Sequence, residues 1–231
     1  MRNSLLAKLN LYQDDHYKIF QSSLIPDVSM LGIRIPIIEK LCKQYTNQQK
    51  MEFLNQYTKE SIYELQLVYC IFLRDVPLTY QDKIGYLDKI LEDTNNWALC
   101  DALVSRCKWI RDDLSSFQSQ LEYYFLKEKF FYQRFVYVTL LQYYLQKENL
   151  PYIYSFCEKP FIRSYYVQMS IAWLLSITFI RFPKDTNDYL EKCTLDDFTK
   201  RKTIQKIKES KQLQLIHITL LNKMKTPSKL K

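Results

Sequence analysis

The chain of 231 residues is long enough to bury one substantial core, so we expect a single domain over residues 1–231. With only 2 Gly and 7 Pro, it has few of the tight turns that all-β and dinucleotide-binding folds require, and an all-α fold is expected. The formal net charge is +8, but residues 200–231 contain ten Lys or Arg against one acid, Glu209, and so carry +9 themselves; subtraction leaves −1 for residues 1–199. This basic segment favours a polyanionic partner, nucleic acid above all, although a solvated tail explains it equally simply.

The cysteines indicate neither a metal site nor a disulfide framework. No Cys-x-x-Cys motif and no nearby His pair occurs, so we expect buried thiols and no metal or other cofactor. The first eight residues lack the long apolar core and cleavage site of a signal peptide, which predicts a cytoplasmic protein. The longest apolar run, residues 169–180, is too short to cross a bilayer and is closed by Arg181, so no membrane association is expected.

Apolar residues recur at helical spacing in almost every segment between polar breaks. A first stripe follows Pro36, which suits the first turn of a helix. A second runs over residues 62–72 and stops before Pro77, and a third over residues 84–91 ends at an Asp-Thr-Asn-Asn cluster that can cap the next helix. Further helices are predicted over residues 97–101 and beyond, 114–127, 130–146, 151–157, 164–182, 186–193, 199–210 and 213–223.

Helix pairs with a period of about 35 to 40 residues are typical of HEAT-type solenoids. Trp97 and Arg134 are 37 residues apart, and Arg134 and Trp173 are 39 apart, so equivalent helices of successive repeats would present them along one face. We therefore predict a right-handed α-solenoid of HEAT-like repeats with a concave, basic groove.

Four residues in these helices are candidates for function. Trp97 and Asp101 lie one helical turn apart, and Arg134 and Trp173 each fall in the middle of an apolar segment. Charged side chains are almost never buried unpaired, so placing a carboxylate and a guanidinium in core-facing helices is costly. The set therefore invites a functional interpretation.

The order and spacing of these four residues resemble the DNA alkylation repair protein family, the AlkD-like DNA glycosylases. In that family a Trp-x-x-x-Asp helix, an Arg helix and a second Trp helix line a concave groove. The resemblance covers nearly the whole chain, from Ser29-Met30-Leu31-Gly32-Ile33-Arg34-Ile35-Pro36 to Lys206-Ile207-Lys208-Glu209-Ser210. It implies a monomeric DNA glycosylase that needs no cofactor and excises N3- or N7-alkylated purines from double-stranded DNA.

The chemistry of that reaction suits the four residues. Alkylation at N3 or N7 leaves the purine positively charged, so its glycosidic bond already tends to break and leave an oxocarbenium-like sugar. Asp101 is expected to stabilise that cation and orient the attacking water. Trp97 and Trp173 would hold the sugar and cationic base through cation–π and dispersion contacts, and Arg134 would bind the adjacent phosphate.

Each residue also has a structural interpretation. Asp101 could cap a helix or pair with Arg134, and both tryptophans could belong to the core; their joint occurrence favours a groove. The alternative function is a non-catalytic HEAT-like module that binds nucleic acid or a protein partner. Trp97-x-x-x-Asp101 together with Arg134 favours the enzyme, whereas the uncharged stretch 167–176 around Trp173 favours the module.

Overall fold

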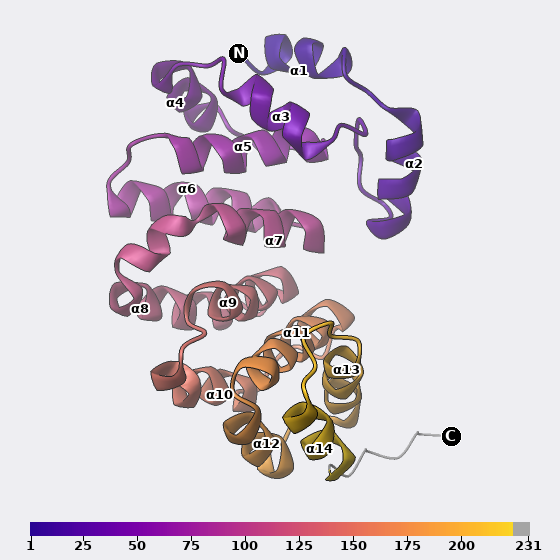
Figure 1. Ribbon diagram of the computed structural model, residues 1–231. Helices are drawn as coiled ribbons and strands as arrows, with labels where there is room; N and C mark the ends of the chain where they lie inside the picture. The colour runs from indigo at the N-terminus through magenta and orange to yellow at the C-terminus, as the bar shows by residue number, and fades with distance from the viewer. Residues whose placement is uncertain (224–231) are drawn as a thin grey trace. The chain divides into compact units, whose positions relative to one another are not determined.

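The structure is a computed structural model that describes residues 1–223 (Figure 1). The predicted all-α class is confirmed: these residues form fourteen α-helices and two short 3₁₀ helices, and no strand beyond one isolated bridge between Ser29 and Ile62. They divide into two compact units, one that ends at Lys108 and one that begins at Trp109, and each is described by itself. The solenoid and the single domain remain predictions.

The first unit contains seven α-helices. They are α1 (Arg2–Asn10), α2 (Asp15–Leu24), α3 (Ile35–Cys42), α4 (Asn47–Asn55), α5 (Tyr63–Asp75), α6 (Tyr80–Asp93) and α7 (Trp97–Arg106). Helix α5 is its centre, because nearly all its side chains are buried and it packs against α3, α4, α6 and α7. Pro36 lies in the first turn of α3, as the sequence predicts.

The second unit follows the 3₁₀ helix Lys108–Asp112. Its α-helices are α8 (Leu114–Phe125), α9 (Phe130–Tyr143), α10 (Leu150–Glu158), α11 (Tyr165–Arg181), α12 (Pro183–Lys192), α13 (Asp197–Lys208) and α14 (Leu215–Lys223), with a second 3₁₀ helix over Lys147–Asn149. Helix α11 is the longest and packs against α9, α12 and α13 (Figure 1). Its apolar sequence is explained by this position, because neighbours cover most of its surface.

The helices alternate in two regular series along the chain. Helices α5, α7, α9, α11 and α13 begin at residues 63, 97, 130, 165 and 197, at intervals of 34, 33, 35 and 32 residues. Helices α4, α6, α8, α10, α12 and α14 begin at residues 47, 80, 114, 150, 183 and 215, at intervals of 33, 34, 36, 33 and 32. Regular intervals of this length are typical of helical-repeat proteins.

A buried carboxylate in α5 holds the loop that positions α2. Glu64 is fully buried and accepts hydrogen bonds from the backbone N–H groups of Leu31, Gly32 and Ile33 at 2.9, 2.8 and 3.2 Å. Gly32 has φ +81°, and a Cβ there would come within 2.5 Å of the Lys18 Cβ atom in α2. Only glycine fits this conformation and this close approach. The loop thereby fixes α2 against the body of the first unit.

Candidate active site

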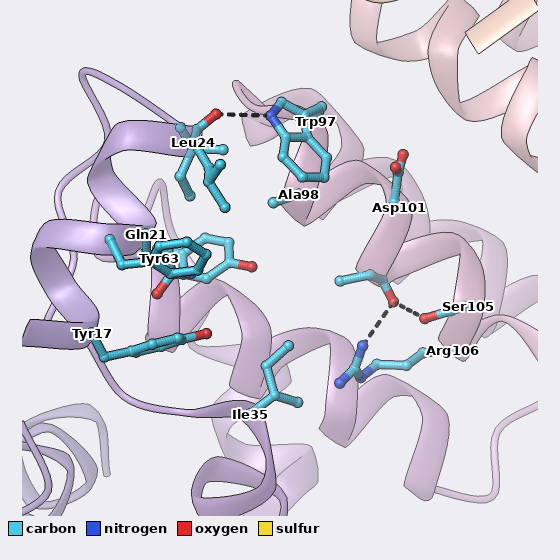
Figure 2. A pocket seen from close by; sticks show the side chains of 13 residues that line it. Tyr17, Gln21, Leu24, Ile35, Tyr63, Trp97, Ala98, Asp101, Ser105 and Arg106 are labelled. Atoms are coloured by element: carbon cyan, nitrogen blue, oxygen red, sulfur yellow. Dashed lines mark hydrogen bonds between the residues drawn. The ribbon is translucent and has the colours of Figure 1, made fainter. Parts of the chain in front are cut away.

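A pocket of about 360 Å³ opens in the first unit between α2 and α7 (Figure 2). Helix α2 supplies apolar and aromatic side chains and one amide, while α7 supplies the face that carries Trp97 and Asp101. Ala98 and Ala102 lie on the same face of α7 and leave room for the pocket because their side chains are small. Ile35 and Tyr63, which begin α3 and α5, complete the wall.

Trp97 is the first residue of α7, and its indole is tied to α2. The Asn96 side chain caps the helix by accepting a hydrogen bond from the Leu99 N–H at 2.8 Å, as the polar cluster before Trp97 predicts. The indole Nε1 donates to the backbone carbonyl of Leu24 at 3.1 Å, at the end of α2 (Figure 2). Trp97 is half-buried, so part of its ring faces solvent.

Asp101 follows one turn later and lines the same pocket. Trp97 and Asp101 therefore share one face of α7, which agrees with their spacing of one helical turn in the sequence. Asp101 is half-buried, and its carboxylate lies on the side of α7 next to the Trp97 indole, away from the Arg106 guanidinium (Figure 2). The arrangement can present a negative charge and a flat π-system to one ligand.

Arg106 is the last residue of α7 and lines the pocket at the opposite end of the helix from Trp97. Its side chain is almost completely buried, with Nη1 donating to the Ala102 carbonyl at 3.0 Å and Nη2 donating to Glu39 Oε1 at 2.9 Å. The Nε atom is buried and has no hydrogen-bond partner. Arg106 is therefore both a structural anchor and a source of one unused N–H at the pocket wall.

Glu39 joins Arg106 to a second arginine. Arg74 makes two parallel hydrogen bonds to the Glu39 carboxylate, each 3.0 Å long, from Nη1 and Nη2. Burial opposes ionisation of Glu39, but the hydrogen bonds and charges of Arg74 and Arg106 outweigh it, so the pKa of Glu39 lies below its ordinary value. The ion pairs of Glu39 with Arg74 and Arg106 thus hold the C-terminal end of α7, where Arg106 lines the pocket.

Gln21 is a pocket residue that the sequence analysis missed. It lies in α2, only 7% exposed, and its Oε1 atom is buried without a hydrogen-bond partner. Nothing in the sequence around residue 21 distinguishes this glutamine from the many others on helix surfaces. Its significance becomes visible only once the loop at Gly32 has placed α2 beside α7.

Arg134 and Trp173 lie in the second unit, on the neighbouring helices α9 and α11. Arg134 is 6% exposed, and its Nη1 atom donates to the backbone carbonyl of Tyr166 at 3.0 Å, which links α9 to the first turn of α11. Trp173 is half-buried in α11, whose only charged residue is Arg181 at its last position. The structure thus brings Trp97 and Asp101 together, and the meeting of the two pairs in one groove stays a prediction.

Trp97, Arg134 and Trp173 do not occupy equivalent positions in their helices. Trp97 is the first residue of α7, Arg134 the fifth of α9, and Trp173 the ninth of α11. From Trp97 to Arg134, and again from Arg134 to Trp173, the residue lies four positions, or about one turn, further from the start of its helix. This shift explains why their spacings of 37 and 39 residues exceed the helix intervals of 33 and 35.

The basic segment 200–231 is described only in part. Within α13, Lys200 donates a hydrogen bond to the Cys193 carbonyl at 2.9 Å, so it has a structural contact. Lys202 lies over the ring of Phe198, and Phe198 contacts the exposed ring of Tyr165. Residues 224–231, with three of the ten basic residues of this segment, lie outside the described part of the chain.

Within residues 1–223, no helix is both long and apolar enough to cross a membrane. Nor do three or more His, Cys, Asp or Glu side chains gather there in a way that could hold a metal ion. All six cysteines are buried and unbonded to one another, as expected, and burial raises the pKa of the Cys42 and Cys70 thiols to about 12.

Comparison with known proteins places the chain in a family. No curated protein sequence matches it. A family model described as DNA alkylation repair enzyme matches residues 5–210, which include the Gly32 loop, both pocket helices and all four candidate residues. Because this match spans most of the 231 residues, the chain belongs to the DNA alkylation repair enzyme family.

Proposed function

We propose that the chain is a DNA glycosylase that hydrolyses the N-glycosidic bond of N3- or N7-alkylated purines in duplex DNA. Family membership supports a role in the repair of alkylation damage. The observation that carries the finer proposal is the pairing of Trp97 and Asp101 in the wall of one pocket. A carboxylate beside a partly exposed indole suits a reaction through two successive cations, first a cationic base and then a cationic sugar.

In the proposed reaction the electron pair of the bond between the sugar C1′ and the base nitrogen leaves with the base, which becomes neutral. The sugar then carries the positive charge, and the Asp101 carboxylate stabilises it electrostatically. A water molecule adds its oxygen to C1′ and gives its proton to Asp101, which returns it to solvent. The products are a free alkylpurine and an abasic site, and no cofactor takes part.

The Trp97 indole is proposed to hold the cationic base before the bond breaks. A cation over an indole face gains roughly 0.5 to 2 kcal/mol, depending on how well water is excluded. The hydrogen bond to the Leu24 carbonyl fixes the ring at the pocket mouth, so little side-chain freedom is lost on binding. Trp173 is proposed to do the same for the sugar from α11.

Arg134 is proposed to bind the phosphate next to the damaged nucleotide. The guanidinium is permanently charged, and its hydrogen bond to the Tyr166 carbonyl fixes its orientation. Helix α11 carries no basic residue before Arg181, so further phosphate contacts must come from other elements. We propose that the basic residues of α13 and the hydroxyl group of the exposed Tyr165 provide them.

Base release from methylated duplex DNA tests the proposal. The protein is incubated with DNA that contains 3-methyladenine and 7-methylguanine, and the released bases are measured by chromatography while DNA binding is measured in parallel. A glycosylase releases free base in many turnovers. Binding without any release would contradict the proposal and support the alternative module, which the uncharged stretch 167–176 of α11 favours.

A further inference from the structure

We propose that the second unit carries a binding site for unpaired DNA, formed by aromatic rings at the starts of α9, α11 and α13. We refer to the rings of Phe130, Tyr165 and Phe198 as the aromatic row. Such a site goes beyond the proposed function, because a side-chain ring can stack on a base only where that base is not held inside a duplex. The repetition of the rings, their exposure and the charge around them support it.

Five successive helices of one series begin with an aromatic residue. It is the first residue of α5, α7, α9 and α11 and the second of α13, namely Tyr63, Trp97, Phe130, Tyr165 and Phe198. In α5 the ring belongs to the core, since Tyr63 is only 2% exposed. A packing role thus explains the first member of the series, but that role requires burial.

The members of the series in the second unit are accessible. Phe130 is 43% exposed and Tyr165 is 59% exposed, and Phe198 is half-buried. Apolar side chains that are exposed close to one another mark interaction sites, whereas single scattered ones are ordinary. The aromatic row therefore indicates a ligand if its rings lie together.

Ring contacts join the row across neighbouring helices. The centroids of Tyr165 and Phe198 lie 6.4 Å apart, which links α11 to α13. Toward α9, the rings of Phe130 and Phe131 lie 4.8 Å apart. The Tyr166 ring lies 5.4 Å from Phe131 and 5.7 Å from Tyr165, and so completes the link. Because α11 packs against both α9 and α13, the rings form one connected set over three neighbouring helices.

The first turns that carry the rings are held in place. The Ser164 side chain caps α11 by accepting a hydrogen bond from a backbone N–H at 3.4 Å, and Asp196 caps α13 in the same way at 3.0 Å. Arg134 donates to the Tyr166 carbonyl at 3.0 Å and so ties the start of α11 to α9. A ring on an ordered turn loses little freedom when a base stacks on it, which favours binding.

The charge near the row favours a polyanion. Residues 127–130, 163–165 and 196–202 contain six Lys or Arg against three Asp or Glu, a net charge of +3. The Lys202 ammonium lies over the Phe198 ring, 5.8 Å from its centroid, so a cation and a ring are presented together. Single-stranded nucleic acids are bound by this combination, since cations attract the phosphates and rings stack on the bases.

Unpaired DNA is the occupant that fits both properties of the row. An apolar protein surface would match the rings but not the surplus of cations, and a duplex would match the cations but keep its bases away from the rings. The chain belongs to a family of DNA repair enzymes, which favours DNA over RNA as the strand.

Binding of single strands with and without bases tests the inference. An oligothymidine, and an oligonucleotide of the same length that lacks all its bases, are labelled and titrated with the whole protein while fluorescence anisotropy is measured. Both carry the same phosphates, so a difference in affinity comes from the bases. Wild type is expected to bind the oligothymidine about tenfold more tightly than the abasic strand.

Variants of the exposed rings localise the effect. Phe130→Leu/Tyr165→Leu removes two rings without changing the charge, so it should lose most of the preference for bases and keep the salt dependence of wild type. Tyr165→Phe, which keeps the ring and loses the hydroxyl group, should retain the preference. Tyr12→Leu is the matched control, because it removes an exposed tyrosine of the first unit, and it should behave as wild type.

Two results would overturn the site. Equal affinity of wild type for the two strands would show that no ring stacks on a base, whether or not any variant folds, and would leave the row to a protein partner. An unchanged preference in a double variant that unfolds at the wild-type urea concentration would place the stacking elsewhere. A preference for bases in a protein that releases no alkylpurine would contradict the glycosylase activity and support the aromatic row, so the two proposals fail separately.

Discussion

The Trp97 indole donates a hydrogen bond to the Leu24 carbonyl at 3.1 Å, and this contact joins the first residue of α7 to the last residue of α2. It links the helix that carries Asp101 to the helix that carries Gln21. Both walls of the pocket are therefore held at one point by the residue proposed to bind the substrate.

Replacing Trp97 by phenylalanine keeps an aromatic ring but removes this hydrogen bond. We expect the free energy of unfolding to fall by about 1 kcal/mol, the usual net contribution of one such bond. We also expect kcat/KM for base release to fall. The phenyl ring lacks the fixed orientation of the indole, and it attracts a cation more weakly. Urea unfolding and base-release kinetics measure the two effects. Unchanged stability would show that the contact to Leu24 does not hold α2.

Replacing Gln21 by methionine removes an unpaired polar atom from the pocket wall at similar side-chain volume. We expect the free energy of unfolding to rise by about 1 kcal/mol, since the cost of the unsatisfied acceptor disappears. Thermal or urea unfolding measures it, with Gln48→Met, which changes an exposed glutamine of α4, as the control that should stay within about 0.5 kcal/mol of wild type. A destabilised Gln21→Met would mean that this amide is satisfied in the folded protein.

The ion pair of Glu39 with Arg74 and Arg106 makes stability depend on pH. Since the pKa of Glu39 is lower in the folded protein than its ordinary value of 4.5, the folded state binds fewer protons in the window between the two values. Its contribution is complete above about pH 4.5 and is lost as the pH falls through the folded pKa. Urea unfolding should be measured near neutral pH and at acidic pH. Between the two, the free energy of unfolding should fall less in Glu39→Gln than in wild type. An equal loss in both proteins would mean that other carboxylates account for it.

The basic residues of α13 should govern the salt dependence of DNA binding. Changing Lys202, Lys206 and Lys208 to glutamine should reduce the slope of log affinity against log salt by up to about 3, because each neutralised phosphate contributes about 0.9. The matched control changes Lys40, Lys43 and Lys59, three exposed lysines of the first unit, and alters the net charge equally. The same slope change in both triple variants would attribute binding to overall charge rather than to α13.

The helices, and the placement of Trp97 beside Asp101, could be predicted from the sequence because both depend on local rules. Asn96 caps α7, and residues four apart share a helix face, so Trp97 and Asp101 had to lie together. One boundary differs from the prediction: α12 begins at Pro183 rather than at residue 186, since proline suits the first turn although the apolar pattern starts later.

Helix α2 and its role in the site could not be predicted in this way. Several of its apolar residues, such as Ile19 and Phe20, are exposed rather than buried, so the helix has no core-facing stripe for a periodicity argument to find. Its position depends on Glu64, more than thirty residues away from the loop that it binds. Such long-range contacts leave no local signal in one sequence.

The central claim is that Asp101 carries the chemistry, and the most direct measurement is base release by Asp101→Asn. The matched control is Asp188→Asn, which alters an exposed aspartate of α12. We predict that Asp101→Asn binds duplex DNA as wild type does, unfolds at a similar urea concentration, and releases 3-methyladenine about a hundredfold more slowly or not at all, while Asp188→Asn keeps full activity. Release at the wild-type rate by a folded Asp101→Asn protein would contradict the account.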